Sequence, residues 1–233
     1  MINNKGFTMV ELMIAMVISS LLVTAVYAAH TTQQRTYHVQ EQVAEMQQTL
    51  RSALFFITSE IRVAGYDPEG NGNFGITSAL AGRLQFTVDD NEDGIRDNDE
   101  KIDIGFTNAA SSVNQDIDGN GIPDLDSNGD GVPDAVAIGK QNYSAANIAK
   151  GYKSFAEKIQ ALEFLYLDST GAVTAVNSDI RSIQITILAR ARRLDQKFTN
   201  SMIYTTPSSQ TWGPYNDNFR RRMLTTTIRC RNL

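Results

Sequence analysis

The first part of the chain is an uninterrupted run of apolar residues. From Met9 to Ala29 the run contains one charged residue, Glu11, and neither Pro nor Gly. A helix over this run, at about 1.5 Å rise per residue, spans roughly 30 Å, which is the thickness of the hydrocarbon core of a bilayer. The pattern therefore predicts a membrane-spanning helix over residues 7–29.

The pattern becomes amphipathic after the apolar run. Apolar residues recur every three or four positions, opposite a face of Gln, Glu and Arg; this stripe comprises Val39, Val43, Met46, Leu50, Leu54, Ile57 and Ile61. Gly65 is suited to the left-handed conformation that ends a helix. We expect one helix over residues 7–64, about 85 Å long, whose second half, residues 30–64, packs on a sheet. A coiled-coil stalk is the alternative, although only about three heptads are available.

Alternation of apolar and polar residues after Gly65 predicts strands. The alternating apolar residues are Leu84, Phe86, Val88, Ile102, Ile104, Phe106, Ile183, Ile185 and Ile187. Further strands are expected at Ala135–Gly139, Leu162–Leu167, Arg181–Leu194 and Phe219–Arg231. Lys153–Ile159 fits a short helix or a strand, and Thr206–Asn218 fits a loop. The expected fold is α+β, with the long N-terminal helix packed on a mostly antiparallel β-sheet head of residues 65–233.

Composition narrows the possible functions. Apolar residues make up 42% of the chain and charged residues 20%, so most of it should fold, and the net charge of −5 argues against a nucleic-acid binder. Cys230 is the one cysteine, which fits the cytosol or an exported protein stabilised without a disulfide. His30 and His38 have no nearby ligands in sequence. There is no nucleophile motif, phosphate loop or zinc spacing, so we expect no enzymatic activity.

Glu11 is an unusual residue for a membrane helix, because a carboxylate at the bilayer centre costs at least about 2.5 kcal/mol. Residues 5–12 around it read KGFTMVEL, and this string resembles the processing site of type IV prepilins. The resemblance implies that prepilin peptidase removes a leader of residues 1–6 by cutting between Gly6 and Phe7, and that Phe7 is then N-methylated. Glu11 would lie one turn inside the mature helix and pair with the cationic amino terminus of a neighbouring subunit.

An ordinary signal peptide cut near Ala28 and Ala29 is the alternative. Its positive region would consist of Lys5 alone. The apolar run is also longer than the roughly 7–15 residues of a signal peptide.

Three acidic segments share the pattern D-x-[DN]-x-[DN]-G-[IV]-x-D. Oxygen ligands at positions 1, 3 and 5, Gly at 6, a carbonyl at 7 and an acid at 9 suit Ca²⁺. The first segment also has Glu100 at position 12, as EF-hand loops do. The expected ligands are Asp89, Asn91, Asp93, Ile95, Asp97, Glu100, Asp116, Asp118, Asn120, Ile122, Asp124, Asp126, Asn128, Asp130, Val132 and Asp134.

The second and third segments resemble the chained repeats of thrombospondin type 3 domains, in which adjacent repeats share ligands. Asp124 and Asp126 are placed for such sharing. We expect one to three Ca²⁺ ions that order the loops 89–100 and 116–134 and brace a head without a disulfide. A disordered acidic loop is the alternative.

Two further strings, IRVAGY at residues 61–66 and FRRRMLTTTIR at residues 219–229, resemble PilW-type minor pilins. The chain lacks the C-terminal Cys pair of many major pilins and has no Pro in the apolar run. Arg220, Arg221 and Arg222 fit a solvated strand face, partners for internal carboxylates, or a surface for an acidic neighbour.

The resemblance implies a minor pilin-like structural subunit that takes part in type IV pilus assembly by initiating or capping the filament tip. Its expected partners are other minor and major pilins, prepilin peptidase and the inner-membrane assembly platform. The chain would be a single-pass protein of the bacterial inner membrane with a periplasmic head, and would later enter the surface pilus. A J-type pseudopilin of type II secretion and a Ca²⁺-dependent adhesin displayed on the pilus are the alternatives.

Overall fold

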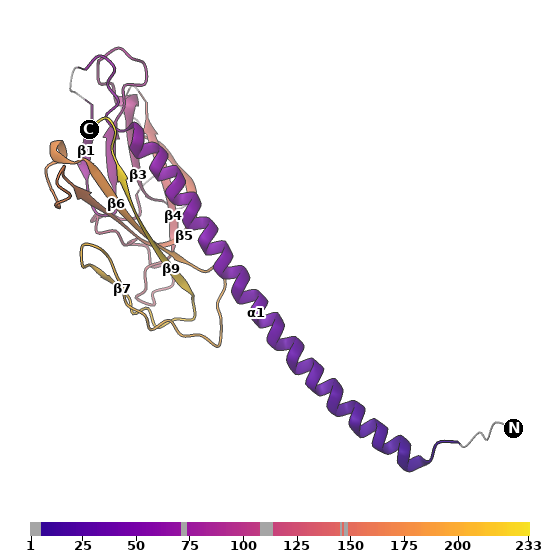
Figure 1. Cartoon of the computed structure of the whole chain (residues 1–233). Helices are drawn as coiled ribbons and strands as arrows, with labels where there is room; N and C mark the ends of the chain where they lie inside the picture. Colours follow the sequence, from indigo (N-terminus) through magenta and orange to yellow (C-terminus); the bar gives the residue numbers. More distant parts are fainter. Residues whose placement is uncertain (1–5, 71–73, 108–113, 145, 147–148) are drawn as a thin grey trace. The chain divides into compact units, whose positions relative to one another are not determined.

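The computed structural model describes residues 6–70, 74–107, 114–144, 146 and 149–233. The chain divides into two compact units, Met1–Gln42 and Val43–Leu233. A single helix, α1 (Met9–Val63), begins in the first unit and ends in the second (Figure 1). Its most apolar 18-residue window has a mean hydropathy of 2.3 and is not buried, and α1 is the one described helix that is long and apolar enough to span a membrane.

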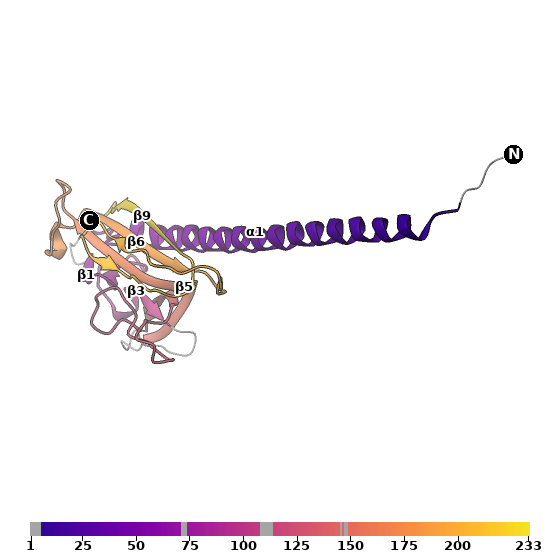
Figure 2. The ribbon, with the colours of Figure 1, turned by 90° about the horizontal axis from the view of Figure 1, so that it is seen from below.

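Seven of the described strands form one antiparallel sheet in the order β1-β2-β3-β4-β5-β6-β9. They are β1 (Ile76–Ala79), β2 (Leu84–Thr87), β3 (Lys101–Thr107), β4 (Val136–Tyr143), β5 (Ala149–Leu167), β6 (Ser182–Arg190) and β9 (Arg221–Arg229). The order places β1 and β9 at the two edges (Figure 2). The short strands β7 (Tyr204–Thr205) and β8 (Thr211–Trp212) pair separately, and the 3₁₀ turns η1 (Asn98–Glu100) and η2 (Asn177–Asp179) lie in loops.

The core lies between the last turns of α1 and one face of the sheet. The buried helix residues are Met46, Leu50, Ala53, Ile57 and Ile61. All but Met46 belong to one cluster with apolar strand residues, among them Phe86, Ile104, Phe106, Ile138, Leu162, Ile185 and Ile187. The structure thus confirms the predicted α+β fold, with a long N-terminal helix and a mostly antiparallel sheet.

The junction between α1 and β2 is fixed by backbone hydrogen bonds. Gly65 has φ +74°, the left-handed conformation predicted for the residue after the helix. Its N–H donates to the Thr87 carbonyl over 3.0 Å, and the Asp89 N–H donates to the Tyr66 carbonyl over 2.9 Å. The start of the first acidic loop is therefore tied to the end of α1.

One open alternative is settled, and one region differs from the sequence expectation. β5 extends back to Ala149, so Lys153–Ile159 is strand, and register shifts in its pairing with β4 obscure the alternation. The expected loop Thr206–Asn218 contains β8, because Trp212 is buried in a small second cluster with Leu188 and Tyr204.

The two faces of α1 should respond differently to truncation. Ile57→Ala should lower the free energy of unfolding by about 2–5 kcal/mol, because Ile57 is fully buried. Phe55→Ala should change it by only about 0.5 kcal/mol, because Phe55 is 71% exposed. Chemical denaturation of the full chain in detergent measures both values. A cost at Phe55 equal to that at Ile57 would contradict the described packing.

Candidate assembly and metal-binding sites

A reciprocal cap closes the N-terminus of α1. The N–H and the hydroxyl of Thr8 donate to Glu11 Oε2 over 2.8 and 2.9 Å, and the Glu11 N–H donates to Thr8 Oγ1 over 3.2 Å. This is a capping box, which satisfies helix donors that would otherwise lack partners. Thr8 was not among the predicted site residues, although a Thr three positions before a Glu is the sequence signal for this cap.

The predicted cleavage position precedes the helix. Gly6 and Phe7 are exposed and lie outside α1, so their peptide bond is not part of the helical hydrogen bonding. The rest of the predicted leader, residues 1–5, lies outside the described residues. An exposed backbone outside the helix suits a peptide bond that a protease must reach.

The first acidic loop joins β2 to β3 and holds two buried carboxylates. Asp89 is fully buried; its Oδ2 accepts from the Gly94 N–H over 3.1 Å, and its Oδ1 has no hydrogen-bond partner among the described residues. Glu100 is 5% exposed and accepts from the Asp90 N–H over 3.2 Å. Oxygens from Asp89, Asp93 and Glu100 lie within 4.8 Å of one another.

The carboxylates at positions 9 and 12 of this loop have different roles. Asp97, at position 9, is exposed and precedes η1, where its N–H donates to Glu100 Oε2 over 2.8 Å. Glu100, at position 12, is the residue that joins Asp89 and Asp93 in the converging group. Of the two expected acidic ligands, the geometry therefore favours Glu100.

The second acidic loop forms a similar group. Asp116 is 2% exposed and accepts from the N–H groups of Asn120 and Gly121 over 3.0 and 2.9 Å. Burial raises the pKa of Asp116 to about 6. Oxygens from Asp116, Asp118 and Asp124 lie within 4.8 Å of one another, and Asp124 accepts from the Ile117 N–H over 2.6 Å.

Backbone contacts fix the second loop against the sheet. The Leu162 N–H of β5 donates to the Gly121 carbonyl over 2.9 Å, and the Gly82 N–H donates to the Gly119 carbonyl over 3.1 Å. Gln210 Nε2 donates to the Asn120 carbonyl over 3.1 Å. A Cβ at Gly121 would collide with the Leu162 carbonyl, and φ there is +89°. The second acidic loop is therefore bonded to β5, to the segment that holds Gly82 and to the segment that holds Gln210.

The third acidic loop has hydrogen bonds from backbone N–H groups to its aspartates like those of the second loop, but its carboxylates do not form a comparable close group among the described residues. Asp126 accepts from the Gly131 N–H over 2.9 Å, and Asp134 accepts from the Ser127 N–H over 3.0 Å. Among the described residues, the carboxylate groups that converge within 4.8 Å are those of the first two loops. Asp126 and Asp130 are exposed. The Ser127 hydrogen bonds lower the pKa of Asp134, and the positive charges of Arg190 and Lys158 add to that effect.

The remaining candidates are held by protein contacts. Arg220 pairs with Asp195 over 2.8 Å, and buried Arg221 pairs with Asp217 over 2.6 Å, so these two arginines serve internal carboxylates. His30 contacts Gln34, and His38 lies 3.6 Å from Glu41. Cys230 is buried, which raises the pKa of its thiol to about 11.

Comparison with known proteins gives a clear result for the N-terminus. A family profile described as the prokaryotic N-terminal methylation motif matches residues 1–27, which confirms the predicted prepilin-type motif. Among solved structures, a type IV-like pilin from Thermus thermophilus is similar at 16% sequence identity, covering 81% of this chain and 98% of that one, with a TM-score of 0.46. The curated proteins gave no match.

Proposed function

We propose that this chain, whose N-terminus is a prokaryotic methylation motif, is a minor pilin-like subunit that helps to initiate or cap a type IV pilus. The observation that carries the proposal is the match of that motif to residues 1–27. The exposed Gly6–Phe7 bond and the long apolar stretch of α1 support it, because processing requires access and assembly requires a membrane anchor.

The proposed assembly step uses the new amino terminus. Prepilin peptidase hydrolyses the Gly6–Phe7 bond, and Phe7 then carries a free amine that is N-methylated and positively charged. Glu11 of one subunit pairs with this amine of a neighbouring subunit, since a carboxylate in apolar surroundings needs a cationic partner. Before assembly, the hydrogen bonds from Thr8 hold the carboxylate at the end of the helix.

Mass spectrometry of the mature protein tests the class. The expected N-terminus is N-methylated Phe7, and a strain without prepilin peptidase should retain residues 1–6. A mature chain that starts near His30 would instead identify a cleaved signal peptide and overturn the proposal.

We further propose that the head binds two Ca²⁺ ions. Asp89, Asp93 and Glu100 would hold one ion, and Asp116, Asp118 and Asp124 the other. The fit rests on burial: Asp89 and Asp116 are almost fully buried carboxylates, and one Asp89 oxygen has no described partner. Buried carboxylates without a cation are costly, and Ca²⁺ accepts six to eight oxygen ligands at about 2.3–2.6 Å.

The proposed role of the ions is structural. The first loop borders the end of α1, and the second is bonded to β5 and to the segments that hold Gly82 and Gln210. An ion in each loop would add a non-covalent brace at both places, in a head whose one cysteine cannot form an intrachain disulfide. The third loop, with exposed Asp126 and Asp130, is excluded from this proposal.

A further inference from the structure

The surface beside the last turns of α1 contains a basic groove. A cavity of about 570 Å³ is lined by Arg62, Arg181, Arg229 and Arg231, together with Thr58 and residues of the edge strand β9. No acidic residue is among those that line it. Arg62, Arg229 and Arg231 are exposed. We call these four arginines and the cavity between them the basic groove.

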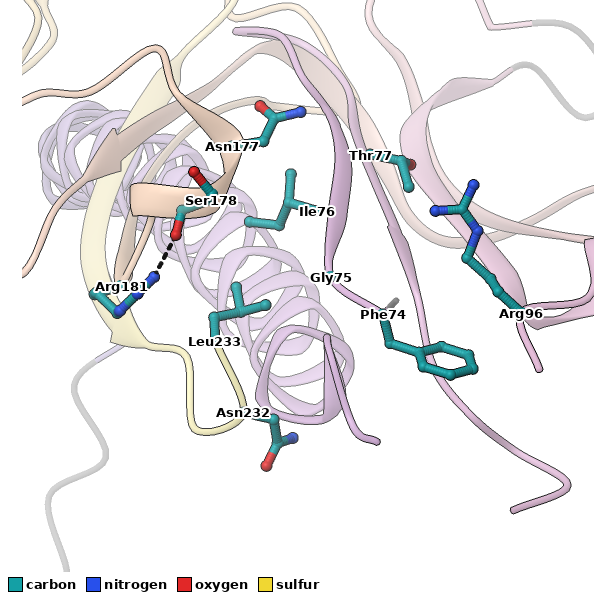
Figure 3. A pocket seen from close by; sticks show the side chains of 10 residues that line it. All are labelled: Phe74, Gly75, Ile76, Thr77, Arg96, Asn177, Ser178, Arg181, Asn232 and Leu233. Carbon is teal, nitrogen blue, oxygen red and sulfur yellow. Dashed lines mark hydrogen bonds between the residues drawn. The ribbon is translucent and has the colours of Figure 1, made fainter. Parts of the chain in front are cut away.

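No carboxylate of the described residues forms an ion pair with an arginine of the basic groove. Among the described residues, the ion pairs involve other arginines, at positions 83, 220 and 221. Arg181 donates to the carbonyls of Ser178 and Ile180, each over 2.8 Å, which fixes the guanidinium without cancelling its charge. Figure 3 shows the bond to Ser178. Four unneutralised guanidinium groups around one cavity favour a partner with several carboxylates.

An acidic hollow lies beside the same end of the helix. A cavity of about 420 Å³ is lined by Glu60, Asp90, Glu92 and Asp99, besides the candidate metal ligands Asp89 and Glu100. Lys140, which also lines it, is paired with Glu60 over 2.7 Å. Asp90, Glu92 and Asp99 are exposed and are not candidate ligands. Their charges remain when an ion fills the first loop. We call this cavity the acidic hollow.

The two surfaces face different directions at one level of the helix. Arg62 lines the basic groove and Glu60 lines the acidic hollow. Residues two apart in an α-helix are separated by about 200° around its axis and by only about 3 Å along it. Two heads that lie side by side in the same orientation would therefore present opposite charges to each other at the same level of α1.

We propose that the basic groove of one copy binds the acidic hollow of a second copy, side by side. The partner of the basic groove is a second copy, because each chain carries both complementary surfaces at the same level of α1. The two surfaces differ, so the contact is heterologous and leaves one free basic groove and one free acidic hollow for further copies. This goes beyond the proposed pilin role, because it concerns contacts between heads and not the N-terminal pairing.

Charge reversal tests the proposal in the full-length protein. The groove variant carries Arg62→Glu and Arg229→Glu, and the hollow variant carries Glu92→Arg and Asp99→Arg. In neutral detergent with Ca²⁺, at about 0.05 M salt, the unchanged protein should form dimers and larger species, and about 1 M salt should disperse them. Each variant alone should associate at least tenfold more weakly, because the reversed charges cancel most of the charge of the altered surface, which then no longer attracts the other surface. Sedimentation velocity measures these species.

Mixing the two variants provides the decisive observation. Association should return in the mixture, because the acidic hollow of the groove variant meets the basic groove of the hollow variant. Arg222→Glu, an exposed change on the same strand β9, is the matched control and should associate normally. Equal urea midpoints for all variants would show that each is folded. A hollow variant that still self-associates, or a mixture that stays monomeric, overturns the proposal; binding of the groove to an anionic lipid or nucleic acid would give such results.

Discussion

Glu11→Gln should keep the chain out of filaments, whereas Thr8→Val should leave its incorporation nearly unchanged. Gln retains the side-chain oxygen that a capping box needs but has no charge. The neighbour's buried amine would then lack its carboxylate, and removal of one partner from a buried ion pair costs about 3–5 kcal/mol. That loss corresponds to at least about a hundredfold in affinity. Quantitative immunoblotting of sheared filaments against the membrane fraction measures incorporation.

The Thr8 variant separates the two roles of Glu11. Thr8→Val removes the hydroxyl that accepts from the Glu11 N–H and costs about 1 kcal/mol of helix stability, but it keeps the carboxylate. If Thr8→Val and Glu11→Gln reduced incorporation equally, the cap and not the ion pair would be the important interaction. A Glu11→Gln chain that entered filaments at the normal level would refute the pairing.

Removal of Ca²⁺ should lower the unfolding midpoint of the head by about 5–10 °C for each occupied site. A ligand at a hundred times its dissociation constant stabilises by about 2.7 kcal/mol. In a chain of this size, 1 kcal/mol shifts the midpoint by about 2–4 °C. Thermal unfolding of the full chain in detergent, with Ca²⁺ or with a chelator, measures the shift, and native mass spectrometry should count two ions.

Three variants assign the ions to loops. Asp89→Asn and Asp116→Asn should each remove one ion and its share of the thermal shift. Asp126→Asn, at the same position of the third loop, is the matched control and should change neither quantity. If three ions were bound, or if Asp126→Asn removed an ion and lowered the midpoint as much as the other variants, the third loop would also bind Ca²⁺. The burial and close approach of the carboxylates would then not distinguish the loops. A midpoint insensitive to the chelator would remove the structural role altogether.

Periodicity was sufficient to predict the main elements. The apolar stripe and Gly65 located the end of α1, because a buried helix face and a left-handed residue leave direct marks in the sequence. The strands with regular alternation, β2, β3 and β6, were also predicted. For Lys153–Ile159, in the first part of β5, the sequence left helix and strand open, because a strand with register shifts and with Lys158 at φ +60° does not alternate regularly.

The sites were less predictable because they depend on contacts between distant segments. The spacing of the acidic segments identified ligand types, and Glu100 set the first segment apart, but nothing in the sequence ranked the second segment above the third. The distinction comes from packing: Gly121 meets Leu162, whereas no atom lies within 4 Å of a Cβ built at Gly129 or Gly131. The cap at Thr8 was predictable, because a Thr three residues before a Glu at the start of a helix is a local signal for a capping box.

The junction at Gly65 has a mechanical consequence. A force that pulls on α1 would reach the sheet through the packed residues Leu50, Ile57 and Ile61 and, after the helix, through the bonds from Gly65 to Thr87 and from Asp89 to Tyr66. The second of these begins the first acidic loop, where Asp89 is a proposed ligand. Tension along a filament would therefore act on the proposed metal site as well as on the core. If the proposed ion is bound there, extracellular Ca²⁺ concentration would contribute to the rupture strength of each subunit, so that a filament bears more load in a calcium-rich medium than in a poor one.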